Sequence, residues 1–217
     1  MKKKNASLLK NNAVQSLLVS LLCILLGLLV GYVALLIINP SGAGKALLDI
    51  VKNFMTYSKP QAQMKYLGST LVKATPLLMC SLSVLFAYKV GLFNIGAAGQ
   101  YVVGAGASLY LALALGMPWY LCLIAGTLAG ALLGAISGAL KAYRNVNEVI
   151  SCIMLNWISL YLVNMLLSRV KEVASPYTMP VGTTNPSALL PCLGLEKLFT
   201  NNRYVTIAVP MAVIVAI

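Results

Sequence analysis

Residues 91–100, GLFNIGAAGQ, combine amide side chains with glycines between two strongly apolar stretches. Asn94 and Gln100 can each donate and accept hydrogen bonds, which suits them to bind a polar solute such as a sugar or a base. Gly96 and Gly99 have no side chain, so the backbone can approach a neighbouring helix or a solute closely. In a membrane such irregular backbone survives only inside protein or along a watery cavity. We therefore predict a broken or re-entrant segment on a solute pathway.

A second polar group follows in residues 145–159, NVNEVISCIMLNWIS. Its polar side chains recur at spacings of three and four residues, which places them on one face of a helix. Asn156 lies about 12 Å along this helix from Glu148. An asparagine at that depth must hydrogen-bond another helix or face a cavity, and the sequence leaves both roles open. Glu148, together with Asn147, either caps the start of the helix or lies near a cytoplasmic entrance.

The two segments together predict a pathway that amide and small residues line or shape. We expect Asn94 to cap the helix that follows it, and Gln100 to hydrogen-bond the solute. The alternative interpretation of residues 91–100 is a tight polar turn at the cytoplasmic surface. The predicted pathway residues are Phe93, Asn94, Gly96, Gly99, Gln100 and Asn156.

Glycines recur every fourth residue through the apolar segment 119–140. They are Gly126, Gly130, Gly134 and Gly138. Small residues at this spacing let two helices approach closely and pack by van der Waals contact. We therefore interpret the row as the packing surface of a buried helix.

Enzymatic and metal chemistry find little support in the composition. The chain has no histidine, and Asp and Glu together number only 4. No two carboxylates pair within an apolar segment, so an intramembrane aspartyl or metalloprotease site cannot be assembled from this set. The 5 cysteines show no CxxC spacing, which argues against a zinc site or a disulfide framework. We expect no catalytic residue, no metal and no cofactor on this chain.

The elements that position these residues are apolar segments long enough to cross a membrane. Of the 217 residues, 60% are hydrophobic and 9% are charged, whereas a soluble domain carries roughly 25% charged residues. The pattern predicts an all-α, polytopic helical bundle, with one transmembrane domain over residues 1–217. The expected helices cover about 14–38, 67–90, 101–115, 119–140, 149–167 and 205–217.

The connections and the end of the chain carry further expectations. The apolar run 205–217 is too short to span and the chain ends inside it, so we expect the membrane domain to be incomplete at its C-terminus. The connection 39–66 contains GKALLDIVKNFM, whose apolar spacing predicts a short amphipathic helix at the membrane surface. The connection 168–204 is rich in Pro, Gly, Ser and Thr, and either docks an external partner or caps the bundle.

The formal net charge is +12, and the cations lie at helix ends and in loops. No soluble face interleaves basic and aromatic residues, so we expect no nucleic-acid binding. The cluster of Lys2, Lys3, Lys4 and Lys10 favours a cytoplasmic N-terminus. A simple count of cations on the two sides does not favour this orientation, but the short connections predicted to be cytoplasmic carry the denser charge.

The motifs together resemble a known family. GLFNIGAAGQ, the glycine-rich helix and KAYRNVNEVISCIMLNWISLYLVN are similar to the permease subunits of bacterial ATP-binding-cassette (ABC) importers for nucleosides. The wider group includes permeases for ribose, other simple sugars and branched-chain amino acids. NPSGAGKALL, KATPLLMCSLSVLFAYKVGLFNIG and SALLPCLGL also match, so the resemblance covers nearly the whole chain. The sequence departs from the pattern at Ala98, where many relatives carry an acidic residue.

The resemblance implies about ten membrane helices, each of roughly 20 apolar residues, of which this chain would supply about the first six. It also implies three partners: a second permease subunit, an ABC ATPase subunit that binds the ATP, and an extracytoplasmic substrate-binding lipoprotein. The protein would be a multi-pass subunit of the bacterial cytoplasmic membrane that takes up a small polar solute, with a nucleoside as the first expectation. Simple sugars and branched-chain amino acids are alternatives within the class, and an ion-coupled carrier or channel is the alternative outside it.

Overall fold

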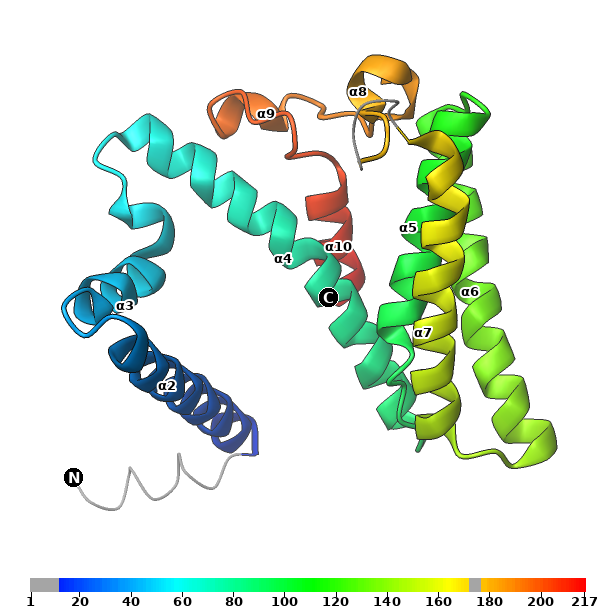
Figure 1. The fold of residues 1–217 in the computed structure, drawn as a ribbon, viewed down its shortest axis with the longest axis horizontal. Helices are drawn as coiled ribbons and strands as arrows, with labels where there is room; N and C mark the ends of the chain where they lie inside the picture. Colours follow the sequence, from blue (N-terminus) through cyan, green and yellow to red (C-terminus); the bar gives the residue numbers. More distant parts are fainter. Residues whose placement is uncertain (1–11, 172–176) are drawn as a thin grey trace. The chain divides into compact units, whose positions relative to one another are not determined.

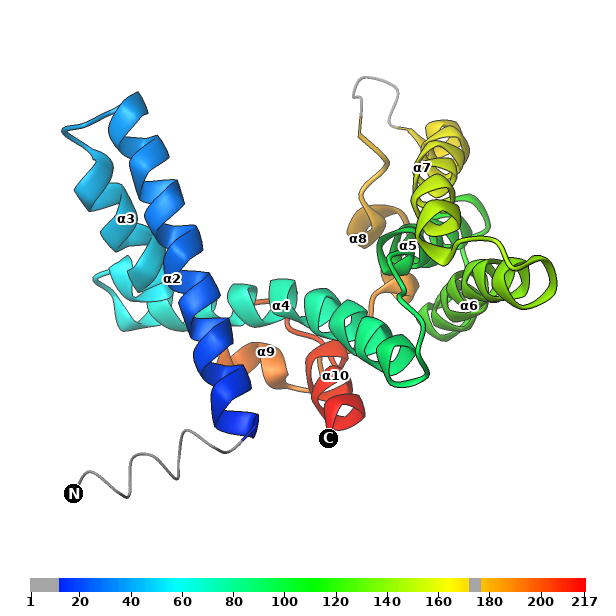
Figure 2. The same ribbon diagram turned by 90° about the horizontal axis from the view of Figure 1, so that it is seen from below.

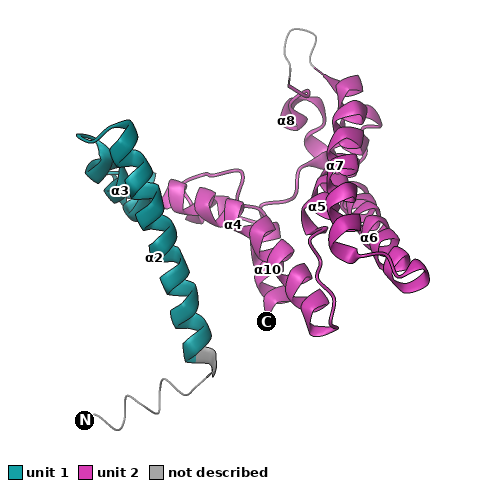
Figure 3. Cartoon of the chain, turned by 60° about the horizontal axis from the view of Figure 1, so that its bottom comes forward, with its two compact units in different colours: residues 1–63 teal, residues 64–217 magenta. Residues whose placement is uncertain are grey.

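The computed structural model describes residues 12–171 and 177–217, and nearly all of them are helical. The chain forms two compact units, which are residues 1–63 and residues 64–217 (Figure 3). All the residues predicted to form a solute pathway belong to the second unit, so the site is built within one unit.

Within the described residues, 5 helices are long and apolar enough to cross a membrane. The shortest has 18 residues, which at 1.5 Å each gives about 27 Å, close to the roughly 30 Å hydrocarbon core. The fold is that of a polytopic helical membrane protein, which confirms the fold class predicted from the sequence. The helices are α2 (Asn12–Ile38), α4 (Pro60–Lys89), α5 (Ala97–Ala114), α6 (Trp119–Arg144) and α7 (Glu148–Leu167).

The first unit contains α2, the short helix α3 (Ala43–Lys52) and the 3-10 turn η1 (Asn53–Thr56). Apolar side chains are exposed along the length of α2, as on a helix that faces lipid. In the turn after α2, Oδ1 of Asn39 accepts hydrogen bonds from the Ser41 hydroxyl and the Gly42 backbone N–H. α3 follows this turn, and it confirms the short helix predicted in the connection after α2.

The helices α5, α6 and α7 lie side by side in the second unit, and α5 contacts both of the others (Figures 1 and 2). Gly104 of α5 faces Gly126 of α6, and a Cβ on Gly104 would lie only 2.9 Å from the Gly126 carbonyl oxygen. Toward α7, a Cβ on Gly106 would lie 2.5 Å from Cγ1 of Val163. Such close contacts require glycine, so van der Waals packing along small residues holds this core together.

The connection after α7 packs against the core at Asn185. The Asn185 side chain is buried, and its Nδ2 donates to the carbonyl oxygens of Ala112 and Met117, both at 2.9 Å. These acceptors lie at the end of α5 and just after it, where helix carbonyls lose their intrahelical donors. The connection is therefore a packed cap at this point. Its short elements are η2 (Ser168–Val170), α8 (Val181–Thr184), η3 (Pro186–Ala188) and α9 (Leu195–Leu198).

Farther along, the same connection is fastened to α4. The buried Asn202 side chain donates from Nδ2 to the Lys65 carbonyl oxygen at 2.9 Å and to the Ser69 hydroxyl at 3.1 Å. Val205 is 1% exposed and packs against Gly68, where an added Cβ would lie 3.0 Å from its Cγ2. Two buried asparagines thus attach one connection to two different helices.

The bounds of two helices in the second unit differ from the predicted ones at their N-termini. α4 begins at Pro60 instead of about 67, because proline suits the first turn of a helix and the polar residues after it continue that helix. α5 begins at Ala97 instead of about 101, because the small residues before Tyr101 form its first turn. The irregular segment is therefore 90–96, shorter than the predicted 91–100.

Two other bounds differ at the polar ends of apolar runs. α6 continues to Arg144 instead of about 140, since cations in the last turn interact favourably with the helix dipole. The last helix, α10 (Ala208–Ala216), is shorter than the predicted 205–217, because Val205 belongs to the connection that packs against α4. Hydropathy alone locates the apolar runs but does not mark these ends.

Candidate functional site

A cavity of about 620 Å³ lies among α4, α5, α6 and the first turns of α7. Phe86 and Phe93 supply aromatic side chains to its wall. Apolar walls with a few placed polar groups are typical of sites for small organic ligands. The polar lining residues are Ser83, Asn94, Gln100, Ser137, Lys141 and Glu148.

The way α4 ends brings the irregular segment to this cavity. Gly91 has a positive φ of 78°, and the Leu92 N–H donates to the Ala87 carbonyl oxygen at 3.0 Å. A glycine in this conformation is a common way to end a helix and redirect the chain. The redirected chain places Phe93 and Asn94 in the cavity wall before α5 begins.

Asn94 and Gln100 bind each other. Nδ2 of Asn94 donates to Oε1 of Gln100, and Nε2 of Gln100 donates to Oδ1 of Asn94, both at 3.3 Å. Nδ2 of Asn94 also donates to the Ser83 hydroxyl at 3.0 Å. The expected cap is therefore wrong: Gly96 occupies the N-cap position of α5, with no side-chain hydrogen bond, because the Asn94 amide is used between α4 and α5.

Asn156 holds the backbone behind the cavity. Its Nδ2 donates to the Ile95 carbonyl oxygen at 3.1 Å, and its Oδ1 accepts from the Gly99 backbone N–H at 2.9 Å. A Cβ on Gly99 would lie 2.5 Å from Oδ1 of Asn156, and a Cβ on Gly96 would lie 3.1 Å from Sγ of Cys152. The sequence leaves two roles open for Asn156, a hydrogen bond to another helix or a place in the cavity lining. The structure shows the first of these. These glycines and Asn156 shape the wall and do not line the cavity.

The glycine row of α6 faces α5 over part of its length. A Cβ on Gly126 would lie 2.8 Å from the Gly104 carbonyl oxygen, and one on Gly130 would lie 3.1 Å from the Gln100 carbonyl oxygen. At Gly134 the nearest atom would be Nε2 of Gln100 at 3.2 Å, whereas Gly138 has open space around it. The row thus changes from helix packing to cavity wall, since Gly134 and Gly138 both line the cavity.

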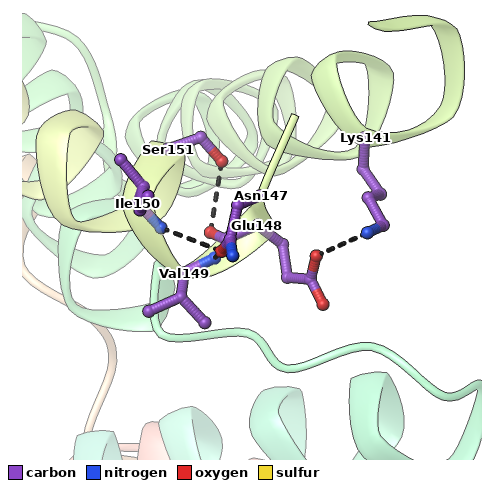
Figure 4. A network of polar contacts seen from close by, with 6 residues as sticks. All are labelled: Lys141, Asn147, Glu148, Val149, Ile150 and Ser151. Carbon is purple, nitrogen blue, oxygen red and sulfur yellow. Dashed lines mark hydrogen bonds and ion pairs between the residues drawn. The ribbon is translucent and has the colours of Figure 1, made fainter. Parts of the chain in front are cut away.

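An ion pair joins α6 to α7 at one end of the cavity, beside the cap of α7 (Figure 4). Nζ of Lys141 lies 2.9 Å from Oε2 of Glu148. Oδ1 of Asn147 accepts from the backbone N–H groups of Val149 at 2.9 Å and Ile150 at 3.4 Å, as an N-cap residue does. Asn147 is therefore structural here, and Glu148 points its carboxylate toward α6 and the cavity.

Sequence reasoning missed several lining residues. Ser83 and Phe86 lie in the apolar run of α4, and their spacing of three residues on one helix face is the only local signal for them. Lys141 lies one turn after Ser137 and seven residues before Glu148. A cation and an acid on either side of the short α6–α7 connection are the signal that could have indicated their ion pair. Ala98 is exposed and does not line the cavity.

The chemistry that this lining offers is hydrogen bonding and stacking. Amides and hydroxyls donate and accept hydrogen bonds, and Lys141 and Glu148 already neutralise each other. In the part of the chain that the structure describes, no three His, Cys, Asp or Glu side chains gather as metal ligands. Such a lining suits a neutral, polar solute with a flat apolar face.

Residues 66–217 match the family described as the permease component of the branched-chain amino acid transport system. The chain belongs to this permease family. The matched range contains the whole cavity and the α5–α7 core, so the family match and the candidate site coincide in the second unit.

Curated relatives of this permease are transport subunits rather than enzymes. The guanosine ABC transporter permease protein NupP of Bacillus subtilis is 34% identical over 192 residues, which cover 86% of this chain and 52% of NupP. The nucleoside ABC transporter permease protein NupB of Lactococcus lactis is 34% identical over 160 residues, 70% of this chain and 41% of NupB. The glucose ABC transporter permease protein TsgB13 of Haloferax volcanii is 34% identical over 105 residues, 46% of this chain and 28% of TsgB13.

The permease chain spans about half the length, or less, of the curated relatives it matches. No solved structure matches it.

Proposed function

We propose that this permease is a membrane subunit of an ATP-driven ABC importer that takes up nucleosides. The observation that carries the proposal is the 34% identity to a guanosine permease over 86% of this chain. The cavity supports it, because amides next to aromatic side chains suit a flat and polar solute.

Within this proposal the pathway residues have two roles. Phe93, Asn94 and Gln100 line the cavity, and Phe93 and Asn94 contact the solute. Gly96, Gly99 and Asn156 hold the backbone that carries them. Glu148 lies at the cytoplasmic entrance, where its ion pair with Lys141 joins α6 to α7.

The proposal includes the partner subunits. A second permease subunit completes the membrane pathway, and an extracytoplasmic lipoprotein delivers the solute. An ABC ATPase subunit binds and hydrolyses ATP, and this chain itself binds no cofactor. ATP binding would favour one of two arrangements of the cavity walls, open to the outside or to the cytoplasm.

We place the importer in the bacterial cytoplasmic membrane, with the N-terminus of this chain in the cytoplasm. The cluster of Lys2, Lys3, Lys4 and Lys10 that supports this orientation lies outside the described residues. Several apolar helices long enough to span make it a multi-pass protein.

A sugar is the second candidate solute, because a glucose permease is among the curated relatives. A branched-chain amino acid fits the cavity less well. Its ammonium and carboxylate groups need charged partners, and the charges that line the cavity, Lys141 and Glu148, already pair with each other at 2.9 Å. An ion-coupled carrier or channel agrees less well with membership of this family.

Uptake in cells tests the proposal. We express the complete importer in bacteria without their own nucleoside uptake and measure accumulation of radiolabelled guanosine. Asn94→Ala removes an amide from the cavity wall and should lower uptake about tenfold, whereas Asn164→Ala, an exposed site on α7, should leave it unchanged. Accumulation of glucose or leucine without any nucleoside would overturn the proposal.

A further inference from the structure

We propose that Asn94 and Gln100 form an exchangeable amide pair: Gln100 swings away, and the Asn94 amide then binds the hydrogen-bonding edge of a nucleobase. This inference rests on the proposed import of nucleosides and adds the part of the ligand that is recognised, which is the base and not the sugar. The ligand is a flat heterocycle with an N–H donor beside a carbonyl or ring-nitrogen acceptor.

The pair has the hydrogen-bonding pattern of a bound base. Each of the two amides donates one hydrogen bond and accepts one along a single edge, and both bonds are 3.3 Å long. The N–H and C=O of uracil, and the amino group and ring nitrogen of adenine, present the same donor and acceptor to an asparagine or glutamine. A base edge can therefore replace the Gln100 amide and leave neither group of Asn94 unpaired.

Gln100 is the member of the pair that can leave. The two bonds between the amides are longer than the usual range of about 2.7–3.2 Å, so they are weak. Asn94 has another bond, to the Ser83 hydroxyl at 3.0 Å, which keeps its amide oriented on the α4 side. On the α6 side, Gly134 and Gly138 leave the wall without side chains, and the space around Gly138 is open. Gln100 thus has a direction in which to move.

The backbone beneath the pair is fixed, so exchange needs only a side-chain movement. Asn156 binds the Ile95 carbonyl oxygen at 3.1 Å and the Gly99 backbone N–H at 2.9 Å. Ile95 follows Asn94 directly and lies before the start of α5, and Gly99 lies in the first turn of α5 immediately before Gln100. A fixed backbone limits the entropy lost on binding to the rotamers of one side chain.

The aromatic side chains of the cavity suit a base rather than a sugar. Phe86 is 75% exposed and Phe93 is 48% exposed, and both line the cavity. Aromatic faces stack on flat heterocycles, and stacking of a base on an aromatic side chain is strong and tolerant of base identity. A sugar ring carries hydroxyls around its whole edge, and each of them would need a polar partner that the apolar part of this wall does not offer.

The test compares ligands that differ at the base edge. The importer, assembled with its partner subunits but without the lipoprotein, is placed in nanodiscs, and displacement of radiolabelled uridine is measured. A methyl group on N3 of uridine removes the N–H from both lactam edges of uracil. We expect 3-methyluridine to bind at least about tenfold more weakly than uridine, and ribose not to compete over the same range.

Two variants separate recognition from a structural role. Asn94→Ala should lower the affinity for uridine to that for 3-methyluridine, so that the ratio of the two affinities falls to about 1. Gln100→Ala removes the competing amide, so uridine should bind as tightly as before or more tightly, with the ratio retained. If the pair only joins α4 to α5, both variants should lose the same amount of uridine affinity. Asn164→Ala is the matched control and should change neither affinity.

The outcomes distinguish this inference from the proposed function. Equal affinity of the wild-type importer for uridine and 3-methyluridine overturns edge recognition, even if Asn94→Ala does not fold. Binding of no nucleoside in nanodiscs, by an importer that transports uridine in liposomes with its lipoprotein, overturns it as well. Absence of transport of both guanosine and uridine by the importer in liposomes with its lipoprotein overturns the proposed function itself.

Discussion

Asn156 and Gly99 form the contact on which the geometry of the cavity wall depends. Oδ1 of Asn156 accepts from the Gly99 backbone N–H at 2.9 Å, which is possible only because Gly99 has no side chain. An added Cβ would lie 2.5 Å from that oxygen and 3.0 Å from the Asn156 Cα. The second distance involves backbone, so a rotamer change of Asn156 cannot relieve both contacts.

Gly99→Ala should therefore lower the stability of the folded permease by about 1–3 kcal/mol, through overpacking against α7. Gly138→Ala is the matched control, because Gly138 is also a helical glycine and nothing lies within 4 Å of an added Cβ. It should be neutral or stabilising by up to about 1 kcal/mol, as alanine favours helix. Thermal unfolding of the purified protein measures both. Equal changes in the two variants would contradict the close contact at Gly99.

At this scale the sequence predicts which residue types matter but not how they pair. Gly96, Gly99 and Asn156 are predicted as pathway residues because amides and glycines are unusual in apolar runs. The structure brings them together behind the cavity wall but not into its lining. The expected cap by Asn94 is wrong, since its partners Ser83 and Gln100 lie on two different helices. No local pattern indicates which of several possible hydrogen-bond partners a tertiary fold supplies.

The end of α6 and the start of α7 form a corner that lines one end of the cavity. α6 ends at Arg144, and Asn145 adopts the left-handed conformation that often follows a helix. Asn147 caps α7. Lys141 and Glu148 join the two helices, with 35% and 26% of their side chains exposed. The corner is thus fixed by backbone and side-chain bonds together.

Lys141→Glu places two carboxylates at this corner and should destabilise it, and the addition of Glu148→Lys should restore the part of the loss that comes from the pair. Because both side chains are partly exposed and screened by solvent, we expect a small but measurable coupling energy. Thermal unfolding of the wild type, the two single variants and the double variant measures it. Arg144→Glu, at the same helix end but outside the cavity lining, is the control, and Glu148→Lys should not rescue it. Additive effects of the two substitutions would contradict the pair.

The cap that follows α7 offers a pH-dependent test. Burial raises the pKa of the Cys192 thiol, the nearby Glu196 carboxylate raises it further, and Arg203 opposes them. Only the thiolate reacts with maleimide, so labelling of Cys192 should require a higher pH than labelling of an ordinary thiol. Glu196→Gln should move the labelling profile to lower pH, and Arg203→Gln should move it to higher pH.

The labelling rate is measured against pH in a variant that keeps Cys192 and replaces the other cysteines with alanine. Shifts in the same direction for both substitutions would contradict this arrangement of the cap. The cysteines to be replaced are Cys23, Cys80, Cys122 and Cys152.

For the whole molecule, the membrane fold follows from the apolar runs, because a stretch of roughly 20 apolar residues has few alternatives to a spanning helix. What the runs do not indicate is which helices pack together. The core of α5, α6 and α7 depends on pairs such as Gly104 with Gly126 and Gly106 with Val163, which lie far apart in sequence. The cavity is formed by that packing. The sequence could therefore indicate one segment of its wall but not the helices that complete the wall.

ATP-driven uptake by the purified system tests the central claim most directly. Proteoliposomes that contain the importer with all its partner subunits, and ATP inside, are exposed to radiolabelled guanosine. We predict that guanosine accumulates above its external concentration only when ATP is hydrolysed, and that excess glucose or leucine does not reduce its uptake. Accumulation of glucose or leucine in place of guanosine, or guanosine uptake that is independent of ATP hydrolysis, would contradict the proposed role as a nucleoside permease.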